Sequence, residues 1–335
     1  MHRLVADIGG TRARFRLLEG DGSQWWIRHE TSWPSQDFQS LAEAIRCYLA
    51  QLSRTERAPI DSAWLAVAGP VRDGAVRFTN LPWQSDAESL RSQFGLPRVY
   101  LVNDLEALTH AVPQLQPEQL LPVQHGNAGK GCRLVIASGT GLGVAGWHGS
   151  GADIHVLPSE GGHADLAPVT ERQAALLHHL RRDLAHVSYE RVLSGPGLVT
   201  LYAFATGQAT GRATIHPEPS DVSPARILEL AEHRDPEALT AVELFSELLG
   251  SFAGNAALHW AATGGVYLAG GVAIQLHPYI LCGPFTKAFA DKGRMRLLLE
   301  SIPVSLITDH QAGLDGISRL ATNPSGQGLR NRKTS

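Results

Sequence analysis

The sequence is poor in the residues that mark extracellular, metal-binding or nucleic-acid-binding proteins. Its 335 residues include only 3 cysteines, Cys47, Cys132 and Cys282, which lie far apart and form no C-x-x-C pair. Such an odd, scattered set is typical of reduced thiols and argues against a disulfide framework or a cysteine zinc site. The formal net charge is −3, and the only basic cluster is the short one from Arg330 to Lys333, which argues against a nucleic-acid-binding surface.

Long apolar runs and a high charge content are missing as well. Charged residues make up 18% of the chain and hydrophobic residues 43%, a balance that disfavours long disordered or coiled-coil stretches. No apolar run is long enough to span a bilayer, and the first strand follows Met1 so closely that we expect no signal peptide. A chain of this length can form two domains with substantial cores. We therefore expect a soluble, cytoplasmic protein that binds neither membranes nor nucleic acid.

The stretch around which the chain is organised is Leu4 to Thr11, with the sequence LVADIGGT. An apolar strand ends in an acid, two glycines and a hydroxyl, and a second strand follows from Ala13 to Leu17. Because glycine has no Cβ, such a turn can bring backbone N–H groups against an anion. Asp7, at the end of the strand, is placed to hold a Mg²⁺ ion or its waters. From this stretch alone, a tight hairpin with a capping aspartate is the alternative.

The same arrangement occurs a second time. Arg133 to Ala137 is another apolar strand, which runs into Ser138 to Gly143 (SGTGLG) and out through Val144 to Trp147. This turn is not a dinucleotide-binding fingerprint, because its glycines are too closely spaced for G-x-G-x-x-G and a strand follows it. Gly126 to Gly131 (GNAGKG) lacks the ending of a P-loop, and we interpret it as a surface turn. Two such hairpins in one chain indicate two half-clamps on one polyphosphate.

Three further segments carry polar side chains suited to catalysis or binding. Asn103 and Asp104 follow the strand Val99 to Val102, at the edge where open α/β sheets bind ligands. Asp104 could take a proton from a hydroxyl, or one of the pair could simply cap the helix that begins there. Pro158 to Asp165 (PSEGGHAD) could present an acid and a histidine to one small ligand, or the histidine could simply be hydrogen-bonded within its loop; zinc would lack ligands there. Glu190, read locally, is only a first-turn acid that begins a short helix.

Periodicity, capping signals and turn residues predict the remaining elements. The predicted helices are Ser35 to Leu52, a short helix behind a Ser85/Glu88 capping box, Glu171 to Leu184 behind Thr170, two helices beginning at Ser223-Pro224 and Asp235-Pro236, Val242 to Ala262 behind a Thr240/Glu243 cap, and a short helix around Ile317 to Leu320. The predicted strands are Ser62 to Ala68, Val266 to Ala269 and Val304 to Ile307, with a hairpin turn at Asp73-Gly74. We expect 206–222 to be an exposed loop and the tail after Asn323 to be disordered.

Taken in order, these blocks resemble the bacterial glucokinase family of the hexokinase/actin-like ATPase superfamily. The blocks are Asp7 to Thr11, Asn103-Asp104, Ser138 to Gly143, Glu160 to His163, Glu190 to Gly197 and Leu268 to Gly271. Each block is weak alone, but the set keeps the family order from the first strand to about Gly316. The resemblance implies a two-domain α/β fold of the actin-like ATPase (ribonuclease H-like) type. A small domain of residues 1–113 and 309–335 and a large domain of residues 114–308 would flank the active-site cleft.

The resemblance also implies transfer of the γ-phosphoryl group of ATP to the 6-hydroxyl of glucose, which is the first step of glycolysis and gives glucose 6-phosphate and ADP. Asp104 would be the catalytic base, and the sugar would be bound by Asn103, Asp104, Glu160, His163 and Glu190, a role that reverses the local interpretation of Glu190. The nucleotide would be bound by Asp7, Gly9, Gly10, Thr11, Gly139, Thr140, Gly141, Gly270 and Gly271. Asp7 would orient Mg²⁺ through water, and the family resemblance implies a homodimer.

The chain departs from the family pattern at two positions. Arg12 stands where the family commonly has Asn, which leaves the role of this position open, and Ser138 replaces a frequent Gly, which we expect to be tolerated. The cysteine-rich zinc motif of the related repressor and kinase sugar family is absent, so we expect no structural zinc. The alternatives are a related kinase with another hexose or a polyphosphate donor, and a non-enzymatic sugar-sensing regulator. Because the first strand begins at Leu4, we expect no DNA-binding extension of the kind that a regulator would need.

Overall fold

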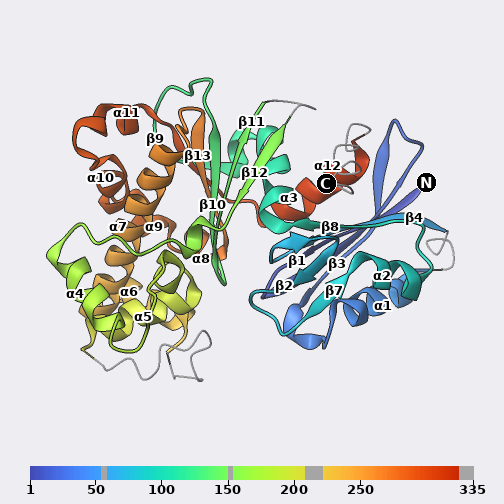
Figure 1. Cartoon of the computed structure of the whole chain (residues 1–335), viewed down its shortest axis with the longest axis horizontal. Coiled ribbons are helices and arrows are strands. Elements are labelled where there is room, and N and C mark those ends of the chain that lie inside the picture. The colour runs from blue at the N-terminus through green and yellow to red at the C-terminus, as the bar shows by residue number, and fades with distance from the viewer. Residues whose placement is uncertain (54–58, 150–153, 208–221, 324–335) are drawn as a thin grey trace. The chain divides into compact units, whose positions relative to one another are not determined.

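The computed structural model describes residues 1–53, 59–149, 154–207 and 222–323. The chain divides into two compact units, each built on its own large sheet (Figure 1). Unit 1 comprises Met1–Leu115, Gly149–Val156 and Asp309–Ser335, and unit 2 comprises Gln116–His148 and Leu157–Thr308. The division expected from the sequence places 149–156 in the large domain, whereas this grouping assigns Gly149–Val156 to unit 1.

Unit 1 is built on a five-stranded sheet in the order β3-β2-β1-β4-β8. Its strands are β1 (His2–Ile8), β2 (Arg12–Gly20), β3 (Trp25–Pro34), β4 (Ile60–Val67) and β8 (Val99–Asn103). β1 and β2 are antiparallel and flank the first glycine turn, whereas β4 runs parallel to both β1 and β8. Because β1, β4 and β8 are parallel, their carboxyl ends lie at one edge of the sheet. The first glycine turn, Asn103 and Asp104 are at that edge.

Helices cover both faces of this sheet. On one face, α1 (Leu41–Gln51) and α2 (Ala87–Phe94) share an apolar core with Leu4, Ala6 and Ile8 of β1. On the other face, α3 (Asp104–Ala111) and α12 (Ala312–Thr322) pack with Val5, the residue of β1 with the opposite orientation. Asp7 therefore belongs to the face covered by α12. The remaining short elements of unit 1 are β5 (Val71–Arg72), β6 (Ala75–Arg77), β7 (Gln84–Asp86), η1 (Ser35–Asp37) and η2 (Val112–Gln114).

Unit 2 repeats the plan of unit 1. Its six-stranded sheet has the order β12-β11-β10-β13-β14-β9. The strands are β9 (Leu120–Gln124), β10 (Arg133–Ser138), β11 (Leu142–His148), β12 (His155–Ser159), β13 (Gly265–Ala269) and β14 (Val304–Ile307). β10 and β11 form an antiparallel hairpin, and β13 runs parallel to β10 and β14, as β4 does to β1 and β8. The two glycine turns thus occupy equivalent places in two similar sheets.

The helices of unit 2 form one large apolar core with its sheet. The longest is α7 (Pro236–His259), where a Cβ on Gly250 or Gly254 would lie 2.2 or 2.5 Å from a carbonyl oxygen of α10 (Pro284–Ala290). Only glycine permits so close an approach between these helices. The other elements are α4 (Glu171–Leu180), α5 (Gly195–Ala205), α6 (Pro224–Glu232), α8 (Gly271–Gln275), α9 (His277–Leu281), α11 (Arg296–Ser301), η3 (Pro117–Gln119), η4 (Gly161–His163), η5 (Tyr189–Arg191) and η6 (Gly293–Met295).

Most elements predicted from the sequence are present, but three assignments were wrong. The helix predicted from Ser35 begins only at Leu41, because a short 3-10 turn precedes it. α2 is capped by Asp86, the last residue of β7, and not by Ser85, which lies one position earlier in that strand. Thr240 lies inside α7, where its hydroxyl donates to a main-chain carbonyl one turn earlier, so two predicted helices are one. Most of the predicted loop 206–222 and the tail after Asn323 lie outside the described residues.

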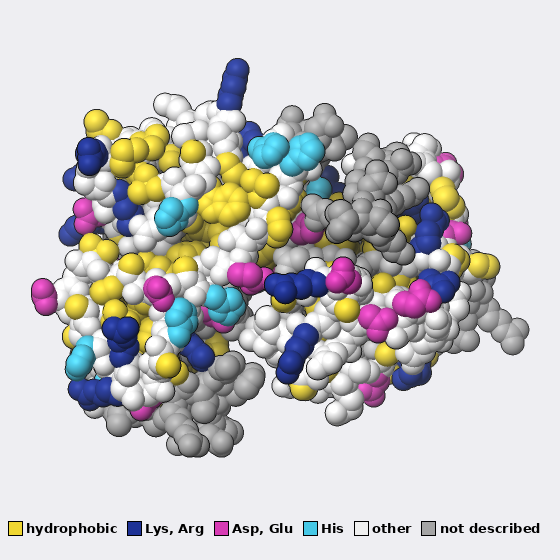
Figure 2. Space-filling view, viewed as in Figure 1, with side chains coloured by type: hydrophobic (Ala, Val, Ile, Leu, Met, Phe, Trp, Pro, Cys, Tyr) yellow, Lys and Arg dark blue, Asp and Glu magenta, His cyan; other side chains and the backbone are white. Residues whose placement is uncertain are grey.

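Among the described residues, none of the helices has the length and apolar character needed to cross a membrane. On the face drawn in Figure 2, the described Lys and Arg side chains lie among Asp and Glu side chains and form no continuous basic patch. An extended basic surface is the usual electrostatic signature of nucleic-acid binding.

Candidate functional site

The first glycine turn is held closed by main-chain hydrogen bonds in unit 1. Gly9 N donates to Arg12 O at 2.9 Å, and the hydroxyl of Ser35 donates to Gly9 O at 2.7 Å. Ser35 N also donates to Thr11 O at 3.0 Å, so the first residue of η1 is hydrogen-bonded to the turn at both Gly9 and Thr11. A Cβ built on Gly9 would meet nothing closer than 3.5 Å, which is an ordinary contact. The fold itself therefore leaves room for a side chain at Gly9.

Asp7 lies beside this turn, and 14% of its side chain is exposed. Its Oδ2 is 3.3 Å from Nη1 of Arg14, its register partner on β2, and a Cβ on Gly313 of α12 would lie 2.9 Å from the same oxygen. Burial raises the pKa of Asp7, and the Arg14 charge and hydrogen bond oppose that rise. Among the described residues, no group of three or more His, Cys, Asp or Glu side chains could hold a metal ion. One carboxylate fits a Mg²⁺ ion that arrives with phosphate oxygens and keeps its waters.

Asn103 and Asp104 lie where β8 passes into α3. Asn103 Oδ1 accepts from Leu105 N at 3.0 Å and from Glu106 N at 3.3 Å, and its Nδ2 donates to Gly69 O at 3.1 Å. Asn103 is thus the N-cap of α3, as the local alternative proposed. Asp104 is the first residue of α3, where the helix dipole favours a carboxylate.

The second glycine turn is tied to the start of α5 in unit 2. Gly139 N donates to Gly141 O at 2.9 Å, and Gly195 N donates to Gly139 O at 2.8 Å. The hydroxyl of Ser138 donates to Leu193 O at 2.8 Å, which ties the end of β10 to the same segment. The turn therefore sits on the segment that leads into α5.

The glycines at the ends of these strands differ in what the fold requires of them. Gly270 has φ +94, and a Cβ there would lie 2.2 Å from Ser138 O, so the fold itself needs glycine. Gly139 and Gly271 have no positive φ, and a Cβ on either would meet no atom within 4 Å. Neither packing nor backbone conformation explains these two glycines, whereas close approach of a bound group would.

Glu190 connects the second glycine turn to the loop from Pro158 to Asp165, called here the polar loop of unit 2. Its Oε2 accepts a hydrogen bond from Leu142 N at 2.9 Å, and its Oε1 lies 3.8 Å from Nδ1 of His163. In the same loop, a Cβ on Gly162 would lie 1.9 Å from Leu142 O, so the loop packs directly on the start of β11. Glu160 precedes this glycine pair, is exposed, and its carbonyl accepts from His163 N at 3.0 Å. Glu190, the loop and the turn therefore form one packed body.

Sequence reasoning missed several residues that shape these sites. Arg14 was read only as part of an alternating strand, although its place opposite Asp7 follows from the hairpin register. His186 was not singled out. Its Nδ1 lies 3.2 Å from Oδ1 of Asp165, and its Nε2 lies 3.1 Å from the carbonyl oxygen of His163. The pairing of His186 depends on the tertiary fold, and no local sequence signal marks it.

The predicted site residues fall into two groups, one in each unit. Unit 1 contains Asp7, Gly9, Gly10, Thr11, Asn103 and Asp104, and unit 2 contains Gly139, Thr140, Gly141, Glu160, His163, Glu190, Gly270 and Gly271. Within each unit, a glycine turn lies at the end of a central strand and polar side chains come from neighbouring segments. Such turns suit phosphate groups, and carboxylate and imidazole groups suit the hydroxyls of a polyol.

Comparison with known proteins gives consistent results. The family model described as Glucokinase matches residues 4–324. The Glucokinase of Psychromonas ingrahamii is 38% identical over 315 residues, which are 93% of this chain and 94% of that protein. The Bifunctional protein glk of Burkholderia pseudomallei is 38% identical over 321 residues; the match covers 95% of this chain, which spans about half (48%) of that relative. The crystal structure of glucokinase from an Antarctic psychrotroph superposes with a TM-score of 0.75 at 34% identity, covering 95% of this chain and 97% of that one.

Proposed function

Because the chain belongs to the glucokinase family, we propose that it transfers the γ-phosphoryl group of ATP to the 6-hydroxyl of glucose. The products are glucose 6-phosphate and ADP. The whole assignment of roles to Asp7, Asp104, Glu190 and the two glycine turns is part of this proposal. It is supported by the match across the chain and by the geometry within each unit.

The observation that carries the proposal is the hydrogen bond from Leu142 N to Glu190 Oε2 at 2.9 Å. Glu190 also lies beside His163, so the side chains suited to a sugar are fixed to the turn suited to a phosphate. A carboxylate and an imidazole accept hydrogen bonds from hydroxyls, and a substrate without the matching hydroxyl leaves buried partners unpaired. This arrangement suits a reaction between a polyol and a polyphosphate better than the binding of either alone.

In the proposed reaction, Asp104 accepts the proton of the 6-hydroxyl as that oxygen attacks the γ-phosphorus. The new bond joins the sugar oxygen to phosphorus, and the bond between the γ-phosphorus and its bridging oxygen breaks, so ADP leaves. A carboxylate at the first residue of α3, where the helix dipole favours negative charge, is suited to accept this proton. Asn103, which caps α3, holds the start of that helix to Gly69 and so fixes the backbone of Asp104.

The glycine turns are assigned to the phosphates. Gly139 and Gly271 have open space where a Cβ would lie, which supports the close approach of a nucleotide to the backbone. Asp7 would orient Mg²⁺ through water, and the ion would neutralise charge on the phosphate oxygens. Arg14 of β2 pairs with the Asp7 carboxylate, with Nη1 3.3 Å from Oδ2. Arg12, on the rim of the first turn, is exposed and is assigned no catalytic role.

The test is the rate of ADP release as a function of sugar and donor. The purified chain is incubated with ATP and Mg²⁺ alone, then with glucose, mannose, fructose or galactose, and each sugar is repeated with polyphosphate. The proposal expects glucose with ATP to give the highest kcat/KM. A faster reaction with another hexose or with polyphosphate would establish the related-kinase alternative. Sugar binding without any phosphoryl transfer would establish the regulator.

Two further proposals concern the location of the protein, argued from its cysteines, and its oligomeric state, argued from the family resemblance. We propose a cytoplasmic location, because the three cysteines, Cys47, Cys132 and Cys282, are all free thiols, as expected in a reducing compartment. We also propose a homodimer, which light scattering after size-exclusion chromatography would test. A mass of one chain at micromolar concentration would contradict it.

A further inference from the structure

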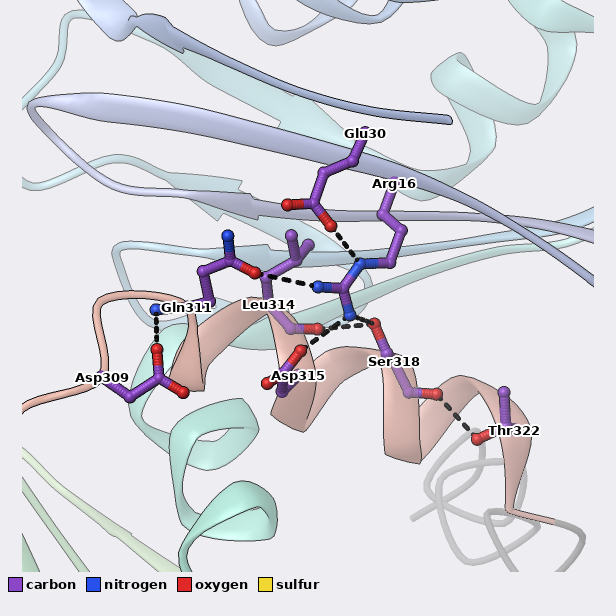
Figure 3. Close-up of polar contacts among 8 residues, drawn as sticks. All are labelled: Arg16, Glu30, Asp309, Gln311, Leu314, Asp315, Ser318 and Thr322. Atoms are coloured by element: carbon purple, nitrogen blue, oxygen red, sulfur yellow. Dashed lines mark hydrogen bonds and ion pairs between the residues drawn. The ribbon is translucent and has the colours of Figure 1, made fainter. Parts of the chain in front are cut away.

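A buried arginine ties the sheet of unit 1 to its last helix. Arg16 of β2 has 5% of its surface exposed and makes four side-chain contacts (Figure 3). Its Nε lies 2.7 Å from Oε2 of Glu30 on β3. Its Nη1 lies 2.7 Å from Oδ1 of Asp315 and 3.0 Å from Oγ of Ser318, and its Nη2 lies 3.3 Å from Oε1 of Gln311. The guanidinium is therefore shared between two carboxylates and two neutral acceptors.

Three of these partners lie along one side of α12. Gln311 precedes the helix, Asp315 lies in its first turn, and Ser318 lies one turn further on. Residues spaced by four and three positions share one face of a helix, so a planar guanidinium that contacts all three fixes both the rotation and the translation of α12. The Ser318 hydroxyl also donates to Leu314 O at 2.7 Å and is thereby oriented toward Arg16.

The same helix lies against two parts of the proposed site. A Cβ on Gly313 would lie 2.9 Å from Oδ2 of Asp7, and a Cβ on Gly316 would lie 1.8 Å from Ala107 O of α3. α3 begins at Asp104, and α12 and α3 lie side by side in Figure 1. The two glycines thus bring α12 into direct contact with the Asp7 carboxylate and with the helix that carries Asp104. A small shift of α12 would disturb both, because neither contact leaves a gap.

We infer that Arg16 is a positioning residue for phosphoryl transfer: by fixing α12 against the sheet, it sets the position of the Asp7 carboxylate and of the helix that begins at Asp104. This inference rests on the proposed function of Asp7 and Asp104. Arg16 acts on both residues through Gln311, Asp315 and Ser318. A buried guanidinium suits the task, because its planar N–H groups reach several acceptors at once and the loss of one acceptor leaves part of a buried charge uncompensated.

The test compares three variants with one control. Arg16→Met removes the charge while keeping an unbranched, apolar side chain. Asp315→Asn weakens the contact between Arg16 and α12 and leaves the ion pair between Arg16 and Glu30 in place. This variant therefore tests the inference if Arg16→Met does not fold. Gly313→Ala leaves Arg16 untouched and places a methyl group against Asp7. The control is Arg172→Met, which makes the same substitution at a more exposed ion pair, with Glu247 at 2.9 Å, within unit 2.

Two readouts separate positioning from general stability. The first is kcat with the KM for glucose, and the second is calorimetric binding of ADP with Mg²⁺ and with a chelator, which requires no turnover. In each of the three variants that folds, we expect kcat to be at least about tenfold lower than in the unaltered chain. The KM for glucose should stay within about twofold of its unaltered value. We also expect the factor by which Mg²⁺ tightens ADP binding to fall at least threefold. The control should change neither readout by more than about twofold.

A folded Asp315→Asn or Gly313→Ala protein that stays within twofold of the control in both readouts overturns the inference. A loss of unfolding free energy without a change in either readout also overturns it, because Arg16 would then serve stability alone. The proposed function fails separately, when the unaltered chain shows no sugar-dependent ADP release. In that case the effect of Mg²⁺ on ADP binding still decides whether Arg16 positions Asp7.

Discussion

Glu190 accepts a hydrogen bond from the backbone N–H of Leu142 at 2.9 Å, although the two residues are 48 positions apart in the chain. Leu142 is the first residue of β11, directly after the second glycine turn. The other oxygen of Glu190 faces His163 at 3.8 Å. One carboxylate therefore belongs to the proposed sugar-binding group and also anchors the proposed phosphate-binding turn. Substitutions at Glu190 should therefore affect the binding of both glucose and ATP. Suitable substitutions can separate the effect on the sugar from the effect on the nucleotide.

Glu190→Ala should raise the KM for glucose and the KM for ATP together, because both the sugar acceptor and the anchor of the turn are lost. Glu190→Gln should raise mainly the glucose KM, since an amide oxygen can still accept from Leu142 N. We expect a change of at least about tenfold in each affected KM, which corresponds to about 1.4 kcal/mol for a lost charge-assisted hydrogen bond. Steady-state kinetics with each substrate varied in turn measure both values. An ATP KM that is equally raised in both variants would refute the anchoring role of Glu190.

Gly139→Ala should lower nucleotide affinity without lowering stability. The added methyl group meets no protein atom within 4 Å and the backbone φ is not positive, so the fold accommodates alanine. In the proposed complex, the methyl group occupies space needed by a phosphate. We expect ADP binding by calorimetry to weaken at least about tenfold, with the melting temperature unchanged within about 2 °C.

Gly270→Ala is the matched control for this prediction. At Gly270 the φ of +94 and the Cβ position 2.2 Å from Ser138 O require glycine, so alanine should destabilise the fold by roughly 2 kcal/mol or more. Equal affinity for ADP in Gly139→Ala and in the unaltered chain would show that the open space at Gly139 is not a phosphate site.

Because of His110, the free energy of unfolding should be lower in mild acid than at neutral pH. This histidine of α3 lies in a pocket with Arg319 and Thr322 of α12, and burial lowers its pKa from 6.5 to about 4. Above pH 6.5, His110 is neutral in the folded and the unfolded chain, so its contribution to stability is fully present. Between pH 6.5 and 4 only the unfolded chain takes up the proton, so stability falls with pH, by at most about 3 kcal/mol for this residue.

His110→Gln removes this proton uptake. Urea unfolding at pH 7.5 and pH 4.5 should therefore show a smaller loss of unfolding free energy in the variant than in the unaltered chain. The other histidines contribute equally to both proteins and cancel in the comparison. The same loss in both proteins would contradict a buried, neutral His110.

The parts of the fold that the sequence predicts are those set by local signals. The strands before the two glycine turns, the turns themselves and the Ser223-Pro224 and Asp235-Pro236 helix starts are all where the sequence places them. Each depends on a few neighbouring residues: an apolar run, a glycine without a Cβ, or a side chain that caps the next turn. The cap of α2 was missed by one position because Ser85 and Asp86 are both residue types that cap helices well, and both lie at the end of β7.

The contacts that build the candidate sites are not local. Leu142 to Glu190 spans 48 residues, and Arg16 to Asp315 spans 299. A short-range pattern cannot reveal which residue faces Glu190, so local reasoning judged it an ordinary first-turn acid. The family resemblance assigned it a sugar-binding role, and the link to the second turn appears only in the folded chain. The Asn103 cap was foreseen as an alternative, since its hydrogen bonds join residues two and three apart.

The most direct test of the central claim is the rate of glucose-dependent ADP release by Asp104→Ala, measured together with its affinity for glucose by calorimetry. Removing the proposed base should cut kcat at least about a hundredfold, while the protein stays folded and still binds the sugar. Turnover within tenfold of the unaltered chain, in a variant that binds glucose normally, would contradict the mechanism.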